Sequence, residues 1–257
     1  MSINYSAKMV GLPHLFMKEN ILIVMPAYNA ARTLKSVYTN IPPNTINSIL
    51  LIDDGSTDTT VSLAKKLGIK TIVHKKNVGY GGNQKTCYRE ALKRGTTQVI
   101  MLHPDGQYDA KDLPLFVDAL KKSKSDLILG SRFLEGRHKT PFYKSISIRF
   151  ITALFNMVLG THLTEANTGY RGFTRKFLET VPFHKNGNGY IFDPQMIIQA
   201  VYFGFRISEV PVSKDYNKEA SSPNLQQSIL HGFENLQLLV EYLLHIFHVK
   251  KADFLVK

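Results

Sequence analysis

The sequence predicts an α/β fold in which a mostly parallel sheet is covered by helices on both faces. Short apolar runs alternate with segments of helical periodicity through the first half of the 257 residues. The connections are short, and polar clusters stand where the apolar runs end. Strands that alternate with helices in this way form parallel sheets that are buried on both faces. A chain of this length fits one large α/β domain with a modest extension.

The first half provides five strands and the helices between them. The strands are short runs rich in Ile, Leu and Val, expected at residues 21–25, 49–52, 69–73, 99–102 and 126–130. Helices with an apolar face are expected from about residue 30, over 61–67, from the glycine-rich turn at 77–82 to residue 92, and over 111–122.

The second half is read as helices at residues 144–159 and 194–203 and strands at 168–174 and 206–212. From 229 to 247, apolar residues recur at 229, 233, 236, 240, 243 and 247, the spacing of one helix face. Neither an internal repeat nor a low-complexity linker interrupts the chain. We therefore expect a main domain at residues 1–222 and a C-terminal helical extension at 223–257.

The composition of the chain limits the classes of ligand that it is expected to bind. The net charge of +12 favours anionic ligands such as nucleotide diphosphates or phospholipid head groups. Nucleic acid is not expected, because no basic–aromatic recognition motif stands out. Cys87 is the single cysteine, so no internal disulfide forms. We see neither a signal peptide nor an apolar run of roughly 20 residues that would span a bilayer. The expected location is the cytoplasm, with a position at the inner face of the membrane left open.

The polar clusters fall at the carboxyl ends of the expected strands, where open α/β sheets bind their ligands. They are Tyr28-Asn29, Asp53-Asp54, the segment 103–109 and Ser131-Arg132. Four separate segments therefore point to one cleft. Within it, the Asp105 carboxylate and the Gln107 amide supply oxygen ligands that suit Mg²⁺ or Mn²⁺. Such an ion would neutralise the charge that develops on a leaving diphosphate.

A series of short motifs follows in order along roughly residues 20–222. The motifs are Pro26-Ala27-Tyr28-Asn29, Ile52 to Asp58, Asn77-Val78-Gly79, Asp105-Gly106-Gln107, Gly130-Ser131-Arg132, Thr168 to Phe173 and Glu209 to Val212. Together they resemble the family-two inverting glycosyltransferases, whose fold is the Rossmann-like GT-A fold. The branch that they resemble most includes dolichyl-phosphate mannosyltransferase and bacterial polyprenyl-phosphate glycosyltransferases.

The resemblance implies a metal-dependent hexosyltransferase that moves a sugar from a UDP- or GDP-linked donor to a polyprenyl phosphate or a glycan. The donor-binding residues that it implies are Pro26, Tyr28, Asp53, Asp54, Gly79, Arg132 and Arg149. Among them, Asp53 is expected close to the nucleoside pocket. It also implies that Asp105 and Gln107 hold the metal. His103 replaces the first aspartate of the family's D-x-D motif, and it is open whether this imidazole ligates the metal, bonds a phosphate or only ends the strand. Ala30 stands where the family often has glutamate, which weakens inferences about the nucleobase.

The acceptor side is less defined. Asp193 lies where relatives carry an acidic residue, so it is a candidate catalytic base, alongside Asp105 and Arg132 as catalytic residues. It could equally cap the helix expected from residue 194, and a phosphate acceptor would need no base. Candidate acceptor contacts are Arg171, Tyr216 and Ser221.

Other interpretations stay open at this point. Lys144 and Arg149 beside an apolar helix suit a polyprenyl phosphate or an anionic bilayer, but an apolar stripe also suits core packing or a homo-oligomer contact. An inert nucleotide-sugar-binding protein would fit the histidine at position 103. A sugar-1-phosphate nucleotidyltransferase would share the architecture, but residues 26–31 lack the glycine-rich, basic loop it would need.

Overall fold

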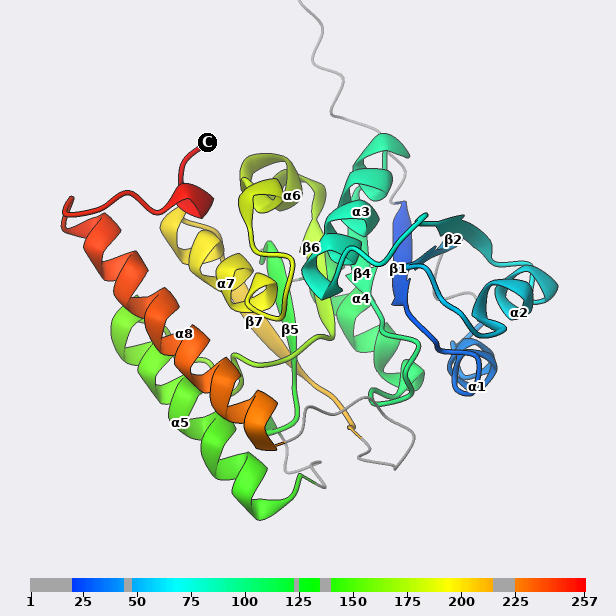
Figure 1. The fold of residues 1–257 in the computed structure, drawn as a ribbon, viewed down its shortest axis with the longest axis horizontal. Coiled ribbons are helices and arrows are strands. Elements are labelled where there is room, and N and C mark those ends of the chain that lie inside the picture. The colour runs from blue at the N-terminus through cyan, green and yellow to red at the C-terminus, as the bar shows by residue number, and fades with distance from the viewer. Residues whose placement is uncertain (1–19, 44–47, 123–124, 135–139, 215–224) are drawn as a thin grey trace, which may run out of the picture.

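The protein is built on one mixed sheet. The computed structural model describes residues 20–43, 48–122, 125–134, 140–214 and 225–257. In this part of the chain the sheet has seven strands in the order β3-β2-β1-β4-β6-β5-β7 (Figure 1). Strand β6 runs antiparallel to β4 and β5, and the other pairs are parallel. The mostly parallel sheet is thus confirmed. The strands are β1 (Ile21–Ala27), β2 (Ser48–Asp53), β3 (Lys70–Val73), β4 (Gln98–Met101), β5 (Leu127–Ser131), β6 (Arg171–Thr174) and β7 (Ile207–Pro211).

The helices follow the expected order with shifted ends. They are α1 (Leu34–Thr39), α2 (Thr60–Lys66), α3 (Tyr80–Lys93), α4 (Leu113–Lys122), α5 (Phe142–Leu159), α6 (Arg175–Thr180), α7 (Phe192–Tyr202) and α8 (Leu225–Ile246). Helix α1 begins at Leu34 rather than near residue 30, because residues 31–33 form a turn. Helix α6 was not expected; it follows directly from β6 and is capped by Thr174, whose hydroxyl accepts the Phe177 N–H at 3.3 Å.

Two apolar cores cover the two faces of the sheet. In β1, Leu22 and Val24 face one core, while Ile21, Ile23 and Met25 face the other, as the alternation of strand side chains requires. The first core is built with residues of α3, α5, α6, α7 and α8, and the second with residues of α1, α2 and α4. Figure 1 shows α5 and α8 side by side along one edge of the molecule, in agreement with their contacts. Helix α8 therefore packs into the same core as the sheet.

Parallel pairing brings the carboxyl ends of the central strands to one edge of the sheet. Ala27 at the end of β1 pairs with Asp53 at the end of β2, and Val24 pairs with Met101 at the end of β4. The polar segments that follow these strands consequently share one side of the molecule. Among the residues that the structure describes, we find no helix with the length and apolar character needed to cross a bilayer.

Candidate active site

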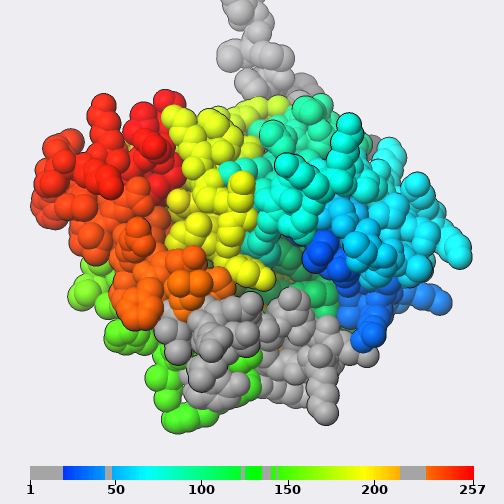
Figure 2. Space-filling view, in the orientation of Figure 1, coloured from blue at the N-terminus to red at the C-terminus, as the bar shows by residue number. Residues whose placement is uncertain are grey.

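A cavity of about 990 Å³ lies at the carboxyl ends of the strands. Figure 2 shows the surface hollowed near the centre of this face, between blue atoms of the β1 region and yellow atoms of the α7 region. The predicted site residues that line the cavity are Pro26, Tyr28, Asp54, Gly79, His103, Asp105, Gln107, Arg132 and Asp193. Asp53, Arg149 and Arg171 do not line it. Tyr216 and Ser221 lie outside the described residues.

Asp54, in the wall of the cavity, is held mainly by the backbone. Its carboxylate accepts the N–H groups of Val78 at 3.0 Å and Gly79 at 3.1 Å, and it contacts His74 Nδ1 at 2.8 Å. Tyr28, on the loop after β1, lines the same cavity and is about half exposed. The expected contact of these two residues with a nucleoside stays a prediction.

Asp53 does not line the cavity and closes a turn. Its side chain is fully buried, and its two oxygens accept the Ser56 N–H at 2.9 Å and the Ser56 hydroxyl at 2.5 Å. Asp53 is the last residue of β2 and Asp54 follows it, and of the two only Asp54 lines the cavity. The expected place of Asp53 close to the nucleoside pocket stays a prediction.

The segment after β4 carries the oxygen-rich part of the site. Asp105 Oδ1 accepts the Gln107 N–H at 3.0 Å, and both residues line the cavity. No group of three His, Cys, Asp or Glu side chains within the described residues forms a complete cation site. Mg²⁺ is commonly bound by one or two carboxylates together with substrate phosphates and water. Asp105 and Gln107 fit such a partial donor set, which a diphosphate would complete.

His103 packs against Tyr80, the first residue of α3. The two rings are stacked 5.4 Å apart, and His103 Nε2 lies 3.3 Å from the Tyr80 hydroxyl. The lack of a side chain at Gly169 leaves room for the imidazole, because a Cβ there would lie 3.1 Å from the same nitrogen. Burial lowers the pKa of His103, which favours the neutral imidazole.

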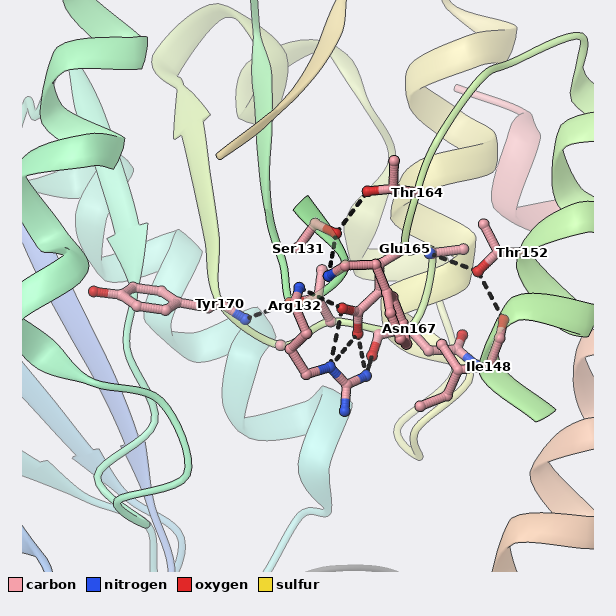
Figure 3. Close-up of polar contacts among 12 residues, drawn as sticks. Ser131, Arg132, Ile148, Thr152, Thr164, Glu165, Asn167 and Tyr170 are labelled. Atoms are coloured by element: carbon pink, nitrogen blue, oxygen red, sulfur yellow. Dashed lines mark hydrogen bonds and ion pairs between the residues drawn. The ribbon is translucent and has the colours of Figure 1, made fainter. Parts of the chain in front are cut away.

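Arg132 is held in a buried ion pair that the sequence did not reveal (Figure 3). Its Nε donates to both oxygens of Glu165, at 2.8 and 2.9 Å, and its Nη2 also pairs with that carboxylate. The Arg132 N–H bonds Glu165 Oε2 at 2.9 Å. Both side chains are nearly inaccessible, yet Arg132 lines the cavity. Nothing in the sequence pointed to Glu165, because the residue belongs to none of the recognised motifs and its neighbours Thr164 and Ala166 carry no charge.

Glu209 fixes the segment that carries Glu165. Its carboxylate accepts the Thr164 N–H at 2.8 Å, the Thr164 hydroxyl at 3.0 Å and the Glu165 N–H at 2.9 Å. Burial raises the pKa of Glu209, while these hydrogen bonds oppose the shift. The Glu209-Val210-Pro211-Val212 motif of β7 thus supports Arg132 through Glu165.

Asp193, also in the wall of the cavity, is held by side chains. Its Oδ2 accepts the Tyr80 hydroxyl at 2.7 Å, and its Oδ1 accepts Gln84 Nε2 at 3.1 Å. Helix α7 begins at Phe192 with Ile191 as its N-cap, so Asp193 lies in the first turn and is not the cap. Both of its oxygens are engaged in the folded protein.

The two other predicted arginines do not line the cavity. Arg171 is fully buried, donates from Nη1 to the Asp193 carbonyl at 2.7 Å, and lies 3.8 Å from Asp193 Oδ1. It therefore positions Asp193. Arg149 is exposed on α5, with its guanidinium 4.8 Å from the centre of the Phe133 ring. The expected contacts of Arg171 with the acceptor and of Arg149 with the diphosphate stay predictions.

The glycines after β3 make room for another part of the protein. A Cβ at Gly79 would come within 2.8 Å of the Asn188 carbonyl, and one at Gly81 within 2.5 Å of the Gly187 carbonyl. The Gly81 N–H donates to Asn188 at 2.7 Å, so the segment 187–189 covers the N-terminus of α3. Gly79 lines the cavity, but its lack of a side chain serves this packing.

The cavity extends beyond the predicted site, toward α5 and α8. It is lined there by Lys144 and Ile148 of α5 and by His231, Phe233 and Leu236 of α8. Tyr80 and Tyr190 also line it, although neither was singled out in the sequence. Tyr80 lies inside the glycine-rich motif, and Tyr190 lies three residues before Asp193. These positions next to predicted site residues were the signals by which the sequence could have identified the two tyrosines.

Comparison with known proteins shows the family. The sequence model of Glycosyl transferase family 2 matches residues 22–181, more than half of the chain. An uncharacterized protein of Methanocaldococcus jannaschii, MJ1222, is 28% identical over 87% of this chain and 92% of its own length. The UDP-N-acetylglucosamine–dolichyl-phosphate N-acetylglucosaminyltransferase of Methanococcus voltae is 24% identical over 77% of this chain and 86% of its own.

A polyprenol monophosphomannose synthase of Mycolicibacterium smegmatis is 25% identical over 76% of this chain and 77% of its own length. Among solved structures, glucosyl-3-phosphoglycerate synthase from Mycobacterium tuberculosis has the same fold, with a TM-score of 0.67 and 17% identity over 91% of this chain and 82% of its own. With the motifs gathered around one cavity, these findings show that the chain belongs to glycosyl transferase family 2 and is a glycosyltransferase.

Proposed function

We propose that the protein transfers a sugar from a UDP- or GDP-linked donor to a polyprenyl phosphate. The observation that carries this proposal is the continuity of the cavity. Asp54 and Asp105 line it at the strand ends, and Ile148, Phe233 and Leu236 line it between α5 and α8. A polar end for a nucleotide and an apolar end for a lipid are thus joined in one space.

In this proposal the nucleoside of the donor lies toward Pro26, Tyr28 and Asp54. Asp105 and Gln107 would hold Mg²⁺ or Mn²⁺ against the diphosphate, and the ion would supply charge neutralisation there. Structures of the Mycobacterium tuberculosis relative contain Mn²⁺ or Mg²⁺ together with UDP, which supports this choice of cofactor. Glu165 already balances the positive charge of the Arg132 guanidinium. Arg132 would therefore act on the diphosphate through directed hydrogen bonds more than through net charge.

The acceptor is placed at the α5–α8 end. The names of the Methanococcus voltae and Mycolicibacterium smegmatis relatives specify dolichyl phosphate and a polyprenol as acceptors, which supports a lipid phosphate over a glycan. A phosphate oxygen attacks the anomeric carbon, and the bond from that carbon to the diphosphate breaks with its electron pair leaving on the nucleotide. The attacking phosphate is already ionised near neutral pH. Asp193 therefore acts as a positioning residue, consistent with its two occupied oxygens.

The outer faces of α5 and α8 support a peripheral contact with a membrane at its cytoplasmic side. Phe150 of α5 is 60% exposed and Phe233 of α8 is 66% exposed, and both reach the mouth of the cavity. Amphipathic helices of this kind lie in the interface of a bilayer, where basic residues such as Arg149 meet anionic head groups. A homo-oligomer would cover the same apolar side chains, so the mass of the protein in solution distinguishes the two.

The test is a transfer assay with sugar nucleotides labelled in the sugar. The protein is incubated with polyprenyl phosphate in vesicles, Mn²⁺ or Mg²⁺, and each of UDP-glucose, UDP-N-acetylglucosamine and GDP-mannose. We expect label in the lipid fraction with one donor class, and none with Asp105→Ala. Nucleotide binding without transfer would favour an inert binding protein, and release of pyrophosphate from a nucleoside triphosphate and a sugar 1-phosphate would favour a nucleotidyltransferase.

A further inference from the structure

Four aromatic rings form a row along one wall of the cavity. Tyr190 stands in this row with 46% of its surface exposed. Its ring is 4.6 Å from that of Tyr80, tilted by 33°, and 4.8 Å from that of His231, which meets it edge-on at 67°. Tyr80 in turn stacks on His103, so the row runs from the end of β4 to α8. The part of Tyr190 that these rings leave uncovered lines the cavity.

The backbone next to Tyr190 is fixed by contacts with α3 and α7. The Asn188 carbonyl accepts the Gly81 N–H of α3, and the Asn188 side-chain oxygen accepts Lys85 Nζ at 2.8 Å. The Gly187 N–H donates to Gln195 Oε1 of α7 at 2.8 Å. The missing side chain of Gly81 allows this approach, as shown above. Tyr190 is therefore held in place before any ligand enters, which reduces the entropy lost on binding.

Tyr80 links Tyr190 to the part of the cavity that contains Asp105 and Asp193. The Tyr80 ring stacks on His103, two residues before Asp105, and the Tyr80 hydroxyl donates to Asp193 at 2.7 Å. The negative charge of Asp105 also adds to burial in raising the pKa of the Tyr190 hydroxyl. With the nucleoside proposed at Tyr28 and the diphosphate at Asp105, the next group of the donor is the one that meets the aromatic row. In a sugar nucleotide, the group beyond the diphosphate is the sugar.

We propose that Tyr190 is the platform on which the pyranose ring of the donor stacks during transfer. The proposal rests on the proposed function and names a specificity-determining contact within it. The C–H groups on one face of a pyranose form an apolar surface that matches an aromatic ring, while the tyrosine hydroxyl stays available to the sugar's own hydroxyls. Because His231 contacts the Tyr190 ring, α8 becomes part of the sugar site. Tyr80 is a positioning residue behind it.

The test compares Tyr190→Ala and Tyr190→Phe with the wild type, using calorimetry for binding and initial rates for transfer. Tyr202→Ala is the matched control, because Tyr202 is also a partly exposed tyrosine but does not line the cavity. We expect Tyr190→Ala to lower kcat/KM for the sugar nucleotide roughly tenfold, while the Kd for the nucleoside diphosphate is unchanged. Tyr190→Phe should keep most of the activity, which also guards against a folding defect in the alanine variant.

Two results would overturn the proposal. Unchanged kcat/KM in Tyr190→Ala would mean that the ring does not touch the sugar. Equal losses of affinity for the nucleoside diphosphate and for the sugar nucleotide would place the ring at the nucleotide instead. If the wild type neither bound a nucleotide nor transferred a sugar, the proposed function itself would fail, and the platform with it. The Kd of the wild type for the nucleoside diphosphate separates these cases.

Discussion

Two carboxylates of the cavity, Asp54 and Asp193, are held in different ways. Asp54 is fixed chiefly by backbone N–H groups of residues 78 and 79. Asp193 is fixed by the side chains of Tyr80 and Gln84, with Arg171 close behind. Backbone donors depend on the path of the chain, whereas side-chain donors depend on the identity of each residue. The surroundings of Asp54 should therefore tolerate substitutions that the surroundings of Asp193 do not.

The largest effect on stability is expected from Glu165→Ala. This change leaves the Arg132 guanidinium buried without its carboxylate, and breaking a buried ion pair costs about 3–5 kcal/mol of unfolding free energy. Urea unfolding of the variant measures the loss. The matched control is Asp118→Ala, which removes the exposed pair with Lys122 and should cost less than about 1 kcal/mol. Equal, small losses in the two variants would contradict the buried pairing.

A smaller loss is expected from Tyr80→Phe. It removes the 2.7 Å hydrogen bond to the Asp193 side chain while leaving the aromatic stack, at a cost of about 1.5–3 kcal/mol. His74→Ala is the counterpart at Asp54, and it should cost less because Asp54 keeps its backbone donors. Thermal unfolding of the two variants, measured side by side, checks the order. If His74→Ala were the more damaging change, the proposed difference between the two carboxylates would be wrong.

Gly81→Ala tests how the Tyr190 segment is seated. The new methyl group would lie 2.5 Å from the Gly187 carbonyl and 2.7 Å from Phe192 Cβ, and such overpacking costs about 1–3 kcal/mol. Gly232→Ala on α8 is the control, because a Cβ there meets nothing within 4 Å and alanine favours a helix. Chemical denaturation should show Gly81→Ala destabilised and Gly232→Ala slightly stabilised. A neutral Gly81→Ala would mean that the 187–189 segment does not pack as described.

The smallest expected effect is on the pH dependence of stability. Burial holds the pKa of His103 below its ordinary value of 6.5. Between the lowered pKa and 6.5, the unfolded chain therefore binds more protons than the folded protein. The free energy of unfolding should consequently fall as the pH drops from about 6.5 toward the lowered pKa. In His103→Asn this part of the pH dependence should disappear, which melting curves at several pH values would show. An unchanged dependence would assign it to another group.

The sequence predicted the fold well because the signals for it are local. The apolar runs of β1, β2 and β4 and the helical stripe of α8 lie within a few residues of where they were expected. Several residues of the cavity were also predictable. Pro26 lies at the end of β1, and Tyr28 and Asp54 directly follow β1 and β2. The carboxyl ends of parallel strands necessarily meet at one edge of the sheet. Only β6, which inserts antiparallel between β4 and β5, broke the simple alternation.

The partners of Asp193 and Arg132 escaped prediction because they come from segments far apart in the chain. Tyr80 and Asp193 are separated by 113 positions, and Arg132 and Glu165 by 33. The same limit explains why the sequence could not show that Arg149 and Arg171 lie outside the cavity lining. An arginine beside a motif can face the solvent or the core, and only the packing of α5 and β6 decides between them.

The central claim is that Asp105 lies at the centre of a metal-dependent nucleotide-sugar site. The most direct test is thermal stabilisation of the wild type and of Asp105→Ala by UDP, GDP, UDP-glucose and GDP-mannose, with and without Mn²⁺. We predict that one nucleotide class raises the Tm of the wild type only with the metal, and that this rise is lost in Asp105→Ala. If none of these ligands stabilised the folded wild-type protein in the presence of Mn²⁺, the claim would be contradicted.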